Sequence, residues 1–178
     1  MKLRALITAC VVAAIVPVAA LADPATPGDH ANGARACQTL RDTLPGTQFK
    51  DTYGTNADKS NAFGVCVSRW TRTEHQNRTA AGTACAGEQA DSTFAASHGG
   101  KTFAQFYGAG PRGAAAMQRC IKSKRAAAST ADLHATENAA KKCAAERALN
   151  PAAFKALHGT NANKSNAFGK CVAKLATA

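Results

Sequence analysis

The chain of 178 residues has few large apolar side chains. Alanine supplies 43 of its residues, whereas residues 23–178 contain only 3 Val, 1 Ile, 6 Leu and 7 Phe. These 17 residues are about 11% of that segment, well below the ~20% under which a charged chain is expected to be disordered. The composition therefore excludes one large hydrophobic core, and the fold needs another source of stability.

Motifs for catalysis and cofactor binding are also missing. The sequence contains no G-x-S-x-G, H-E-x-x-H, G-x-G-x-x-G or P-loop pattern, and no C-x-x-C of the kind that zinc sites and redox pairs use. Asn56-x-Asp58-x-Ser60 resembles the start of a calcium loop, but the loop glycine and its final acidic residue are absent. We therefore predict no catalytic residue, no cofactor and no metal site.

The first 22 residues have the pattern of a secretory signal peptide. A short basic stretch is followed by an apolar run over residues 5–21, and Ala20-Leu21-Ala22 forms an A-x-A cleavage site. Ile7-Thr8-Ala9-Cys10 imitates a lipoprotein box, but the apolar run continues well beyond Cys10. We predict cleavage after Ala22 and no later membrane-spanning segment, hence a secreted protein, or a periplasmic one in a Gram-negative source.

The remaining chain contains a repeat. Residues 54–67 read GTNADKSNAFGVCV and residues 159–172 read GTNANKSNAFGKCV, with twelve identities in fourteen positions. Residues 108–121 keep the same twelve-residue step from Gly to Cys but little else. The aromatic pairs Phe49/Tyr53, Phe103/Tyr107 and Phe154/His158 precede the three repeat glycines. We therefore divide the chain into a flexible segment 23–33, unit 1 (34–70), a divergent unit 2 (83–124) and unit 3 (130–176), with linkers at 71–82 and 123–130.

Apolar residues within the units recur at helical spacing. Phe63, Cys66, Val67 and Trp70 follow an i, i+3, i+4, i+7 pattern, and the series from Phe168 to Leu175 repeats it. Abundant alanine and few β-branched residues also favour helix. Asn150 and Pro151 are typical of the start of a short helix, and the glycines at 54, 108 and 159 of a helix end. The predicted fold is all-α, with each unit a helical hairpin and a short intervening helix.

Six cysteines remain after the leader, and each unit holds two. Six cysteines allow fifteen connectivities. Pairing within each unit closes all three units in the same way, and it joins two positions that are predicted to face inward in one hairpin. Loops of about 30 residues correspond to roughly 3–4 kcal/mol per bridge. We therefore predict three disulfides that compensate for the small apolar content: Cys37–Cys66, Cys85–Cys120 and Cys143–Cys171.

The stretch T-N-x-[D/N]-K-S-N is the most distinctive polar feature. One interpretation is local: Asn or Thr caps the following helix and the neighbouring side chains complete the turn. The other is a pair of ligand-contacting surfaces, in which amides and lysines meet sugar hydroxyls or anionic groups. The candidate ligand-contacting residues are Asn56, Lys59, Asn61, Asn161, Lys164 and Asn166.

Positive charge is in excess but dispersed. Residues 23–178 carry 20 basic and 11 acidic residues, a net charge of +9. This charge favours contact with anionic envelope polymers, polysaccharides or acidic lipids. The sequence has few aromatic residues and no recognisable nucleic-acid-binding motif, which argues against specific nucleic-acid binding. The sequence makes no prediction of oligomeric state.

The motif G-T-N-A-N-K-S-N-A-F-G-K-C-V resembles a repeat of uncharacterised secreted proteins of high-GC Gram-positive, actinobacterial-type bacteria. The resemblance covers residues 34–70 and 140–175 clearly and 83–124 in outline; it implies export and repeated units, and no activity. Our hypothesis is a secreted, non-enzymatic binding or structural module. The alternatives are a cell-wall or carbohydrate hydrolase, for which Glu74, Glu88 and Asp91 could supply carboxylates, and a cationic antimicrobial or toxin-like protein.

Overall fold

The computed structural model describes residues 24–108 and 115–177, which contain helices and no strand. The predicted signal peptide, residues 1–22, lies outside the described residues. The all-α prediction is confirmed. The helices are α1 (Pro27–Thr43), α2 (Gln48–Tyr53), α3 (Ala62–Ala90), α4 (Phe94–Ser97), α5 (Phe103–Tyr107), α6 (Ala116–Leu149), α7 (Pro151–His158) and α8 (Ala167–Ala176).

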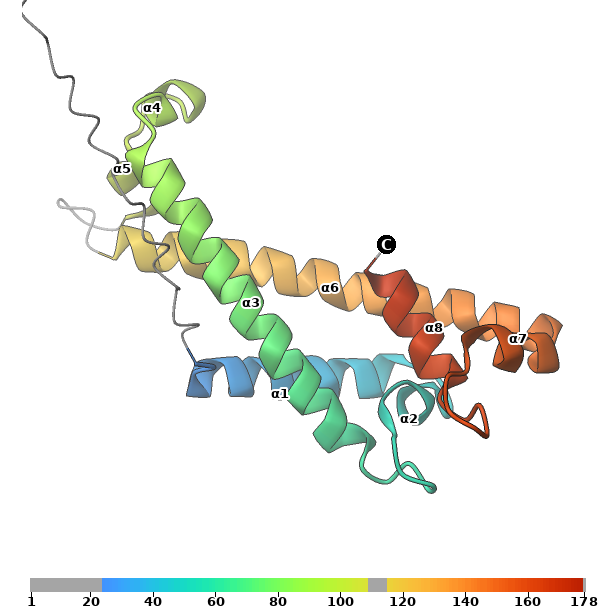
Figure 1. Cartoon of the computed structure of the whole chain (residues 1–178). Helices are drawn as coiled ribbons and strands as arrows, with labels where there is room; N and C mark the ends of the chain where they lie inside the picture. The colour runs from blue at the N-terminus through green and yellow to red at the C-terminus, as the bar shows by residue number, and fades with distance from the viewer. Residues whose placement is uncertain (1–23, 109–114, 178) are drawn as a thin grey trace, which may run out of the picture.

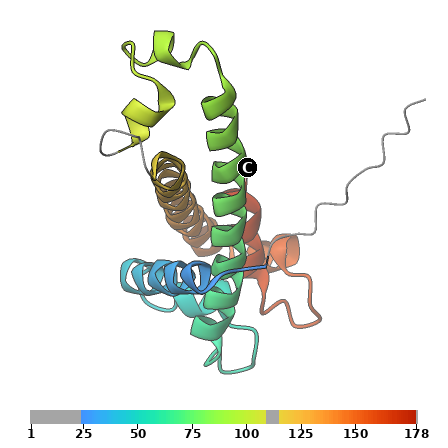
Figure 2. The same ribbon diagram turned by 90° about the vertical axis from the view of Figure 1, so that its left-hand side faces the viewer.

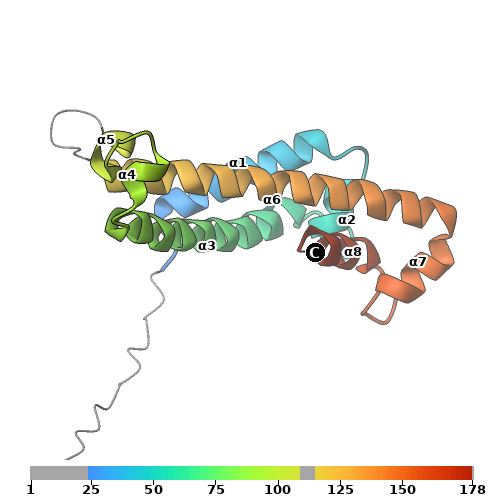
Figure 3. The ribbon, with the colours of Figure 1, turned by 90° about the horizontal axis from the view of Figure 1, so that it is seen from above.

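Three hairpins follow one another by sharing their long helices. The α1–α3 hairpin encloses α2, the α3–α6 hairpin carries α4 and α5 at its end, and the α6–α8 hairpin encloses α7 (Figure 1). Helices α4 and α5 lie at the far end of α3 from α1, as Figure 2 shows. From above, α3 and α8 lie on the same side of α6, one beyond the other (Figure 3).

The two predicted linkers are wrong, because residues 71–82 lie inside α3 and residues 123–130 inside α6. Residues 27–33, expected within a flexible segment, instead form the first turns of α1. A capping box at Thr26 and Asp29 starts that helix, and Gly33 is buried where α1 crosses α3. A Cβ atom on Gly33 would lie 2.7 Å from the backbone nitrogen of Thr71, so glycine permits this close crossing.

The three predicted disulfides are present. Cys37–Cys66, Cys85–Cys120 and Cys143–Cys171 have Cα–Cα distances of 5.8, 6.0 and 6.0 Å, which are typical of disulfides. All six cysteines are completely buried. Each bridge therefore lies at the centre of the packing of its own hairpin.

The packing forms two cores rather than one for each unit. The larger core joins units 1 and 3, because Leu40, Phe49 and Cys66 belong to the same buried cluster as Phe154 and Phe168. The second core is confined to unit 2, where Phe94 and Phe103 surround the Cys85–Cys120 bridge. Units 1 and 3 are therefore one structural body.

The Phe-x-x-x-aromatic pairs hold the short helices in place. The ring centroids of Phe49 and Tyr53 on α2 are 5.2 Å apart, and those of the equivalent pairs on α5 and α7 are 5.0 and 4.8 Å apart. In each case the residues lie one turn apart, so both rings face the same core. The same contact thus recurs in all three units.

Candidate functional site

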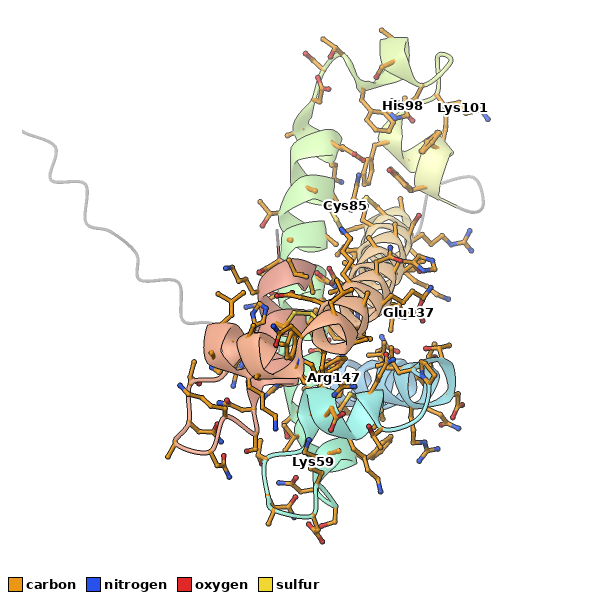
Figure 4. All side chains as sticks on the ribbon, turned by 90° about the vertical axis from the view of Figure 1, so that its right-hand side faces the viewer. Lys59, Cys85, His98, Lys101, Glu137 and Arg147 are labelled. Atoms are coloured by element: carbon orange, nitrogen blue, oxygen red, sulfur yellow. A yellow bond between two sulfur atoms is a disulfide. The ribbon has the colours of Figure 1, made fainter. Side chains whose placement is uncertain are left out.

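Two loops of nearly identical sequence face each other across a cleft. The unit 1 loop (residues 54–61) connects α2 to α3, and the unit 3 loop (residues 159–166) connects α7 to α8. Both loops project from the same end of the molecule, with Lys59 at the base of the first (Figure 4). The space between them, about 830 Å³, is here called the inter-loop cleft. Its lining includes Asp51, Asn56, Lys59, Arg69, Arg72, Asn161, Asn166 and Lys170.

The asparagines of the motif hold each loop in shape. In the unit 1 loop, Oδ1 of Asn61 accepts a hydrogen bond from the backbone N–H of Thr55 at 3.0 Å, and its Nδ2 donates to Oγ1 of Thr55 at 2.7 Å. Nδ2 of Asn56 donates to the hydroxyl of Ser60 at 2.9 Å. The unit 3 loop has equivalent bonds around Asn166, with Nδ2 of Asn161 at 2.9 Å from Ser165.

These bonds refine the local interpretation of the motif. Asn61 and Asn166 are the N-cap residues of α3 and α8, but their side chains do not bond to the helix. They bond back into the loop instead, so the loop is a closed polar frame that precedes the helix. A rigid frame needs no rearrangement to contact a ligand, which reduces the entropic cost of binding.

Glycine and lysine have unexpected backbone roles in both loops. Gly54 and Gly159 end α2 and α7 as predicted, yet their φ angles are negative, at −68° and −74°. Glycine is needed there because a Cβ atom would lie 2.4 and 2.7 Å from the Cβ atoms of Lys59 and Lys164. The two lysines take the left-handed conformation, with φ of 56° and 55°, which is uncommon for a residue with a side chain.

The loops meet because α8 approaches α2 closely. A Cβ atom on Gly169, in the first turn of α8, would lie 2.6 Å from the carbonyl oxygen of Thr52 on α2. Gly64 occupies the same motif position at the start of α3, and a Cβ atom there would meet nothing within 4 Å. The contact at Gly169 brings the unit 3 loop beside the unit 1 loop.

The acidic residue that lines the cleft is already neutralised. Asp51 bonds to Lys59 on one side, and Nη1 of Arg147 donates to its Oδ2 at 2.8 Å. Burial alone would raise the pKa of Asp51, but hydrogen bonds from Lys59, Arg147 and Thr47 outweigh it, so the pKa lies below its ordinary value. Asp51 is therefore ionised and fully engaged, and it does not repel an anion in the cleft.

Three further basic residues give the cleft its charge. Arg69 and Arg72 extend from α3 and Lys170 from α8, and all three are exposed. The Arg69 guanidinium lies 5.9 Å from the centre of the Tyr53 ring. Arg72 and Lys170 have no ion-pair partner within residues 24–108 and 115–177. With four basic residues and one acidic residue along its walls, the cleft attracts anions.

Four of the six candidate residues predicted from the motif line the cleft. Asn56, Lys59, Asn161 and Asn166 line it, whereas Asn61 lines a neighbouring hollow beside Arg72. Lys164 lies outside it, with its Nζ donating to the carbonyl oxygen of Gly159 at 3.0 Å.

Sequence reasoning missed the basic residues that follow the loops. Arg69, Arg72 and Lys170 lie within the helices, beyond the repeated motif. The signal that could have found Arg72 is helical spacing. The face of α3 opposite its apolar stripe carries residues three or four positions apart: Asn61, Val65, Ser68 and Arg72.

The carboxylates considered for a hydrolase are all bonded to neighbouring side chains. Glu74 is buried, and its Oε2 accepts a hydrogen bond from Arg125 at 2.9 Å. The hydrogen bond from Lys124 lowers the pKa of Glu88, and hydrogen bonds from Thr93 lower that of Asp91. A glycosidase needs one carboxyl group whose pKa is raised so that it stays protonated.

One grouping of metal-binding residue types occurs in the described segments. Donor atoms of Glu146, His158 and Cys171 lie within 4.8 Å of one another. The sulfur of Cys171 is bonded to Cys143, so it is not the thiolate that zinc requires. Nε2 of His158 lies 3.0 Å from Oε1 of Glu146, so these two groups bond to each other.

Comparison with known proteins adds no assignment. The chain matches no protein-family model, no curated protein and no solved structure. Across the described residues, no helix combines the length and the apolar character that crossing a bilayer requires.

Proposed function

We propose that this protein is a non-enzymatic binding module at the exterior of a bacterial cell, and that its inter-loop cleft holds an anionic envelope polymer. The observation that carries the proposal is the convergence of the two motif loops on a cleft with four basic residues and one neutralised acid. The predicted leader and the three disulfides support an oxidising location outside the cytoplasm.

The shape and charge of the cleft favour a polymer with spaced anionic groups. Arg72 and Lys170 extend from two different helices, and each can donate to a phosphate or carboxylate group. The amide and hydroxyl groups of the two loops form polar edges on either side, where sugar or polyol hydroxyls can bond. A duplicated loop is suited to a ligand whose chemical unit also repeats.

The test is binding to polyanions of defined chemistry. Polyphosphate and polygalacturonate are titrated into the full mature chain, with dextran as the neutral polymer, over a series of salt concentrations. We expect binding to both polyanions that weakens with salt, because exposed charge interactions are screened. Binding to double-stranded DNA is measured as well, because the chain has no recognisable motif for nucleic acid and such binding reports charge attraction alone.

A matched pair of double variants separates the cleft from the net charge. Arg72→Ala with Lys170→Ala removes two charges from the cleft, and Lys141→Ala with Lys142→Ala removes two exposed charges from α6. We expect at least tenfold weaker binding for the cleft variant, since a hydrogen bond to a charged group contributes ~1.5–3 kcal/mol. Equal losses in the two variants would show that binding follows overall charge and that the cleft is not the site.

A further inference from the structure

A second hollow opens beside the inter-loop cleft. This side pocket, of about 360 Å³, lies between α3 and α8 and is lined by Tyr53, Trp70, Val172 and Ala176 among others. Thr52, Arg69, Gly169 and Ala173 line both spaces, so the two hollows are continuous past Arg69. A ligand in the cleft can therefore extend a substituent into the pocket.

The two ends of this continuous space differ in chemistry. Tyr53, Trp70, Val172 and Ala176 form one apolar wall of the side pocket, beside the polar side chains of Thr73, Gln76 and Thr136, whereas the inter-loop cleft is cationic. The Trp70 N–H donates to the Tyr53 hydroxyl at 3.0 Å, so the polar groups of both buried rings are satisfied within the protein. Arg69, above the Tyr53 ring, marks the boundary between the apolar and cationic parts.

The far end of the side pocket limits what can enter. Nδ2 of Asn77 donates to Oδ2 of Asp132 at 2.8 Å, and both residues belong to the pocket lining. The Asp132 carboxylate disfavours a second anionic group at that end. The volume corresponds to the lower part of the range for small-molecule sites, ~300–1,000 Å³.

From these features we infer that the ligand is an amphipathic anion: its anionic group lies in the inter-loop cleft and a compact apolar substituent fills the side pocket. The inference rests on the proposed function and narrows it, because a plain polyanion leaves the apolar wall unused. Each methylene that enters such a pocket tightens binding about fourfold. Selection by the pocket therefore adds to attraction by charge.

Trp70 provides a direct probe of the pocket, because it is the single tryptophan of the chain. Hexyl phosphate is titrated into the mature protein while tryptophan fluorescence is recorded, with methyl phosphate and hexanol as ligands that lack the apolar group or the charge. We expect hexyl phosphate to change the Trp70 emission and to bind at least tenfold more tightly than either control ligand. Added salt is expected to weaken the binding of hexyl phosphate and methyl phosphate but not that of hexanol.

A variant that fills the side pocket tests the inference, and the same substitution elsewhere is its control. Ala176, half-buried on α8, lines the side pocket and not the inter-loop cleft, so Ala176→Leu narrows the pocket without changing charge. Ala127→Leu makes the same change at an exposed position of α6 outside both spaces. We expect Ala176→Leu to lose the tenfold preference for hexyl over methyl phosphate while polyphosphate binding persists, and Ala127→Leu to keep both properties.

The outcomes separate this inference from the proposed function. Equal affinity for hexyl and methyl phosphate, with polyphosphate still bound through Arg72 and Lys170, overturns the inference alone. Hexanol binding as tightly as hexyl phosphate, or an unchanged preference in Ala176→Leu, overturns it as well. Failure of polyphosphate and polygalacturonate to bind, in the salt series above, overturns the proposed function.

Discussion

Arg125 on α6 donates a hydrogen bond from Nε to Oε2 of the buried Glu74 on α3, at 2.9 Å. Its Nη2 lies 3.0 Å from Oδ1 of Asp29, which is completely buried in α1. One guanidinium thus joins three helices through two buried carboxylates. The hydroxyl of Ser129 donates to the other oxygen of Glu74 at 2.5 Å, and Arg78 lies 3.2 Å from Asp29.

Arg125→Met is expected to lower the free energy of unfolding by about 3–5 kcal/mol. Methionine keeps the aliphatic stem and helix propensity, but two buried carboxylates lose a charge partner. Chemical denaturation followed by far-UV circular dichroism measures the change. Arg119→Met, at an exposed position of the same helix, is the control and is expected to change the free energy of unfolding by less than about 0.5 kcal/mol. Equal effects in the two variants would contradict a stabilising role for the buried network.

Stability is expected to fall in acid, and Asp29 is one cause. Burial alone would raise the pKa of Asp29, but hydrogen bonds from Thr26 and the charges of Arg78 and Arg125 hold it below the ordinary value of 3.8. A lowered pKa in the folded state contributes stability that is present above the unfolded value and is lost as pH falls through the folded value. Thermal melts between pH 7 and pH 2 should therefore show a falling melting temperature below about pH 4.

Asp29→Asn tests that assignment. The amide is similar in size but does not titrate in this range, so the variant should be less stable at neutral pH and lose less stability in acid. Asp42→Asn, at an exposed position, is the control and should retain the acid dependence of the parent protein. An unchanged slope in Asp29→Asn would assign the acid sensitivity to other carboxylates, such as Asp51.

Gly64→Ala and Gly169→Ala should have opposite effects, although both glycines occupy the same motif position. Alanine at 64 meets open space and should stabilise α3 by about 0.5–1 kcal/mol through helix propensity. Alanine at 169 would place a methyl group 2.6 Å from the Thr52 carbonyl oxygen, so destabilisation of about 1–3 kcal/mol is expected. Denaturation midpoints of the two single variants measure the difference, and effects of equal sign would contradict the close α2–α8 approach.

Removal of different disulfides should disturb different regions. Each double Cys→Ala variant is expected to lose about 3–4 kcal/mol, since the bridges close loops of similar length. Loss of Cys85–Cys120 should increase amide hydrogen exchange in α4, α5 and the adjoining ends of α3 and α6 only, because that core is separate. Loss of Cys143–Cys171 should also increase exchange in α1 and α2, which share the core of unit 3. Exchange confined to unit 3 would argue for separate cores.

Local features of the fold were predictable because they depend on local chemistry. The apolar stripe through Cys66 and Trp70 predicted the start of α3, and Asn150 caps α7 by accepting from the backbone N–H of Ala153 at 3.0 Å. The disulfides followed from the repeated positions of the cysteines. Each of these predictions depends on the spacing of residues within one unit.

The central parts of α3 and α6 were not predictable from an apolar pattern. Between residues 71 and 82 the buried side chains are Thr71, Glu74 and Ala81, so this stretch of α3 packs largely through polar contacts. Glu74 and Arg78 bond across to Arg125 and Asp29, which are distant in sequence. Helix in that segment therefore depends on partners that a single-chain pattern does not identify, and the same holds for the cleft, whose walls come from units 1 and 3.

The continuity of α3 and α6 has a consequence for insertions and deletions along the chain. Each residue of an α-helix turns the chain by about 100°, so deleting one residue between Trp70 and Cys85 would rotate unit 2 by that angle around α3. The bonds of Glu74 and the Cys85–Cys120 bridge could not both be kept. A change of seven residues, about two turns, restores the angle but shifts α3 by about 10.5 Å along its axis, so both contacts are kept only when α6 changes length by the same amount. The tips of the motif loops carry no such constraint.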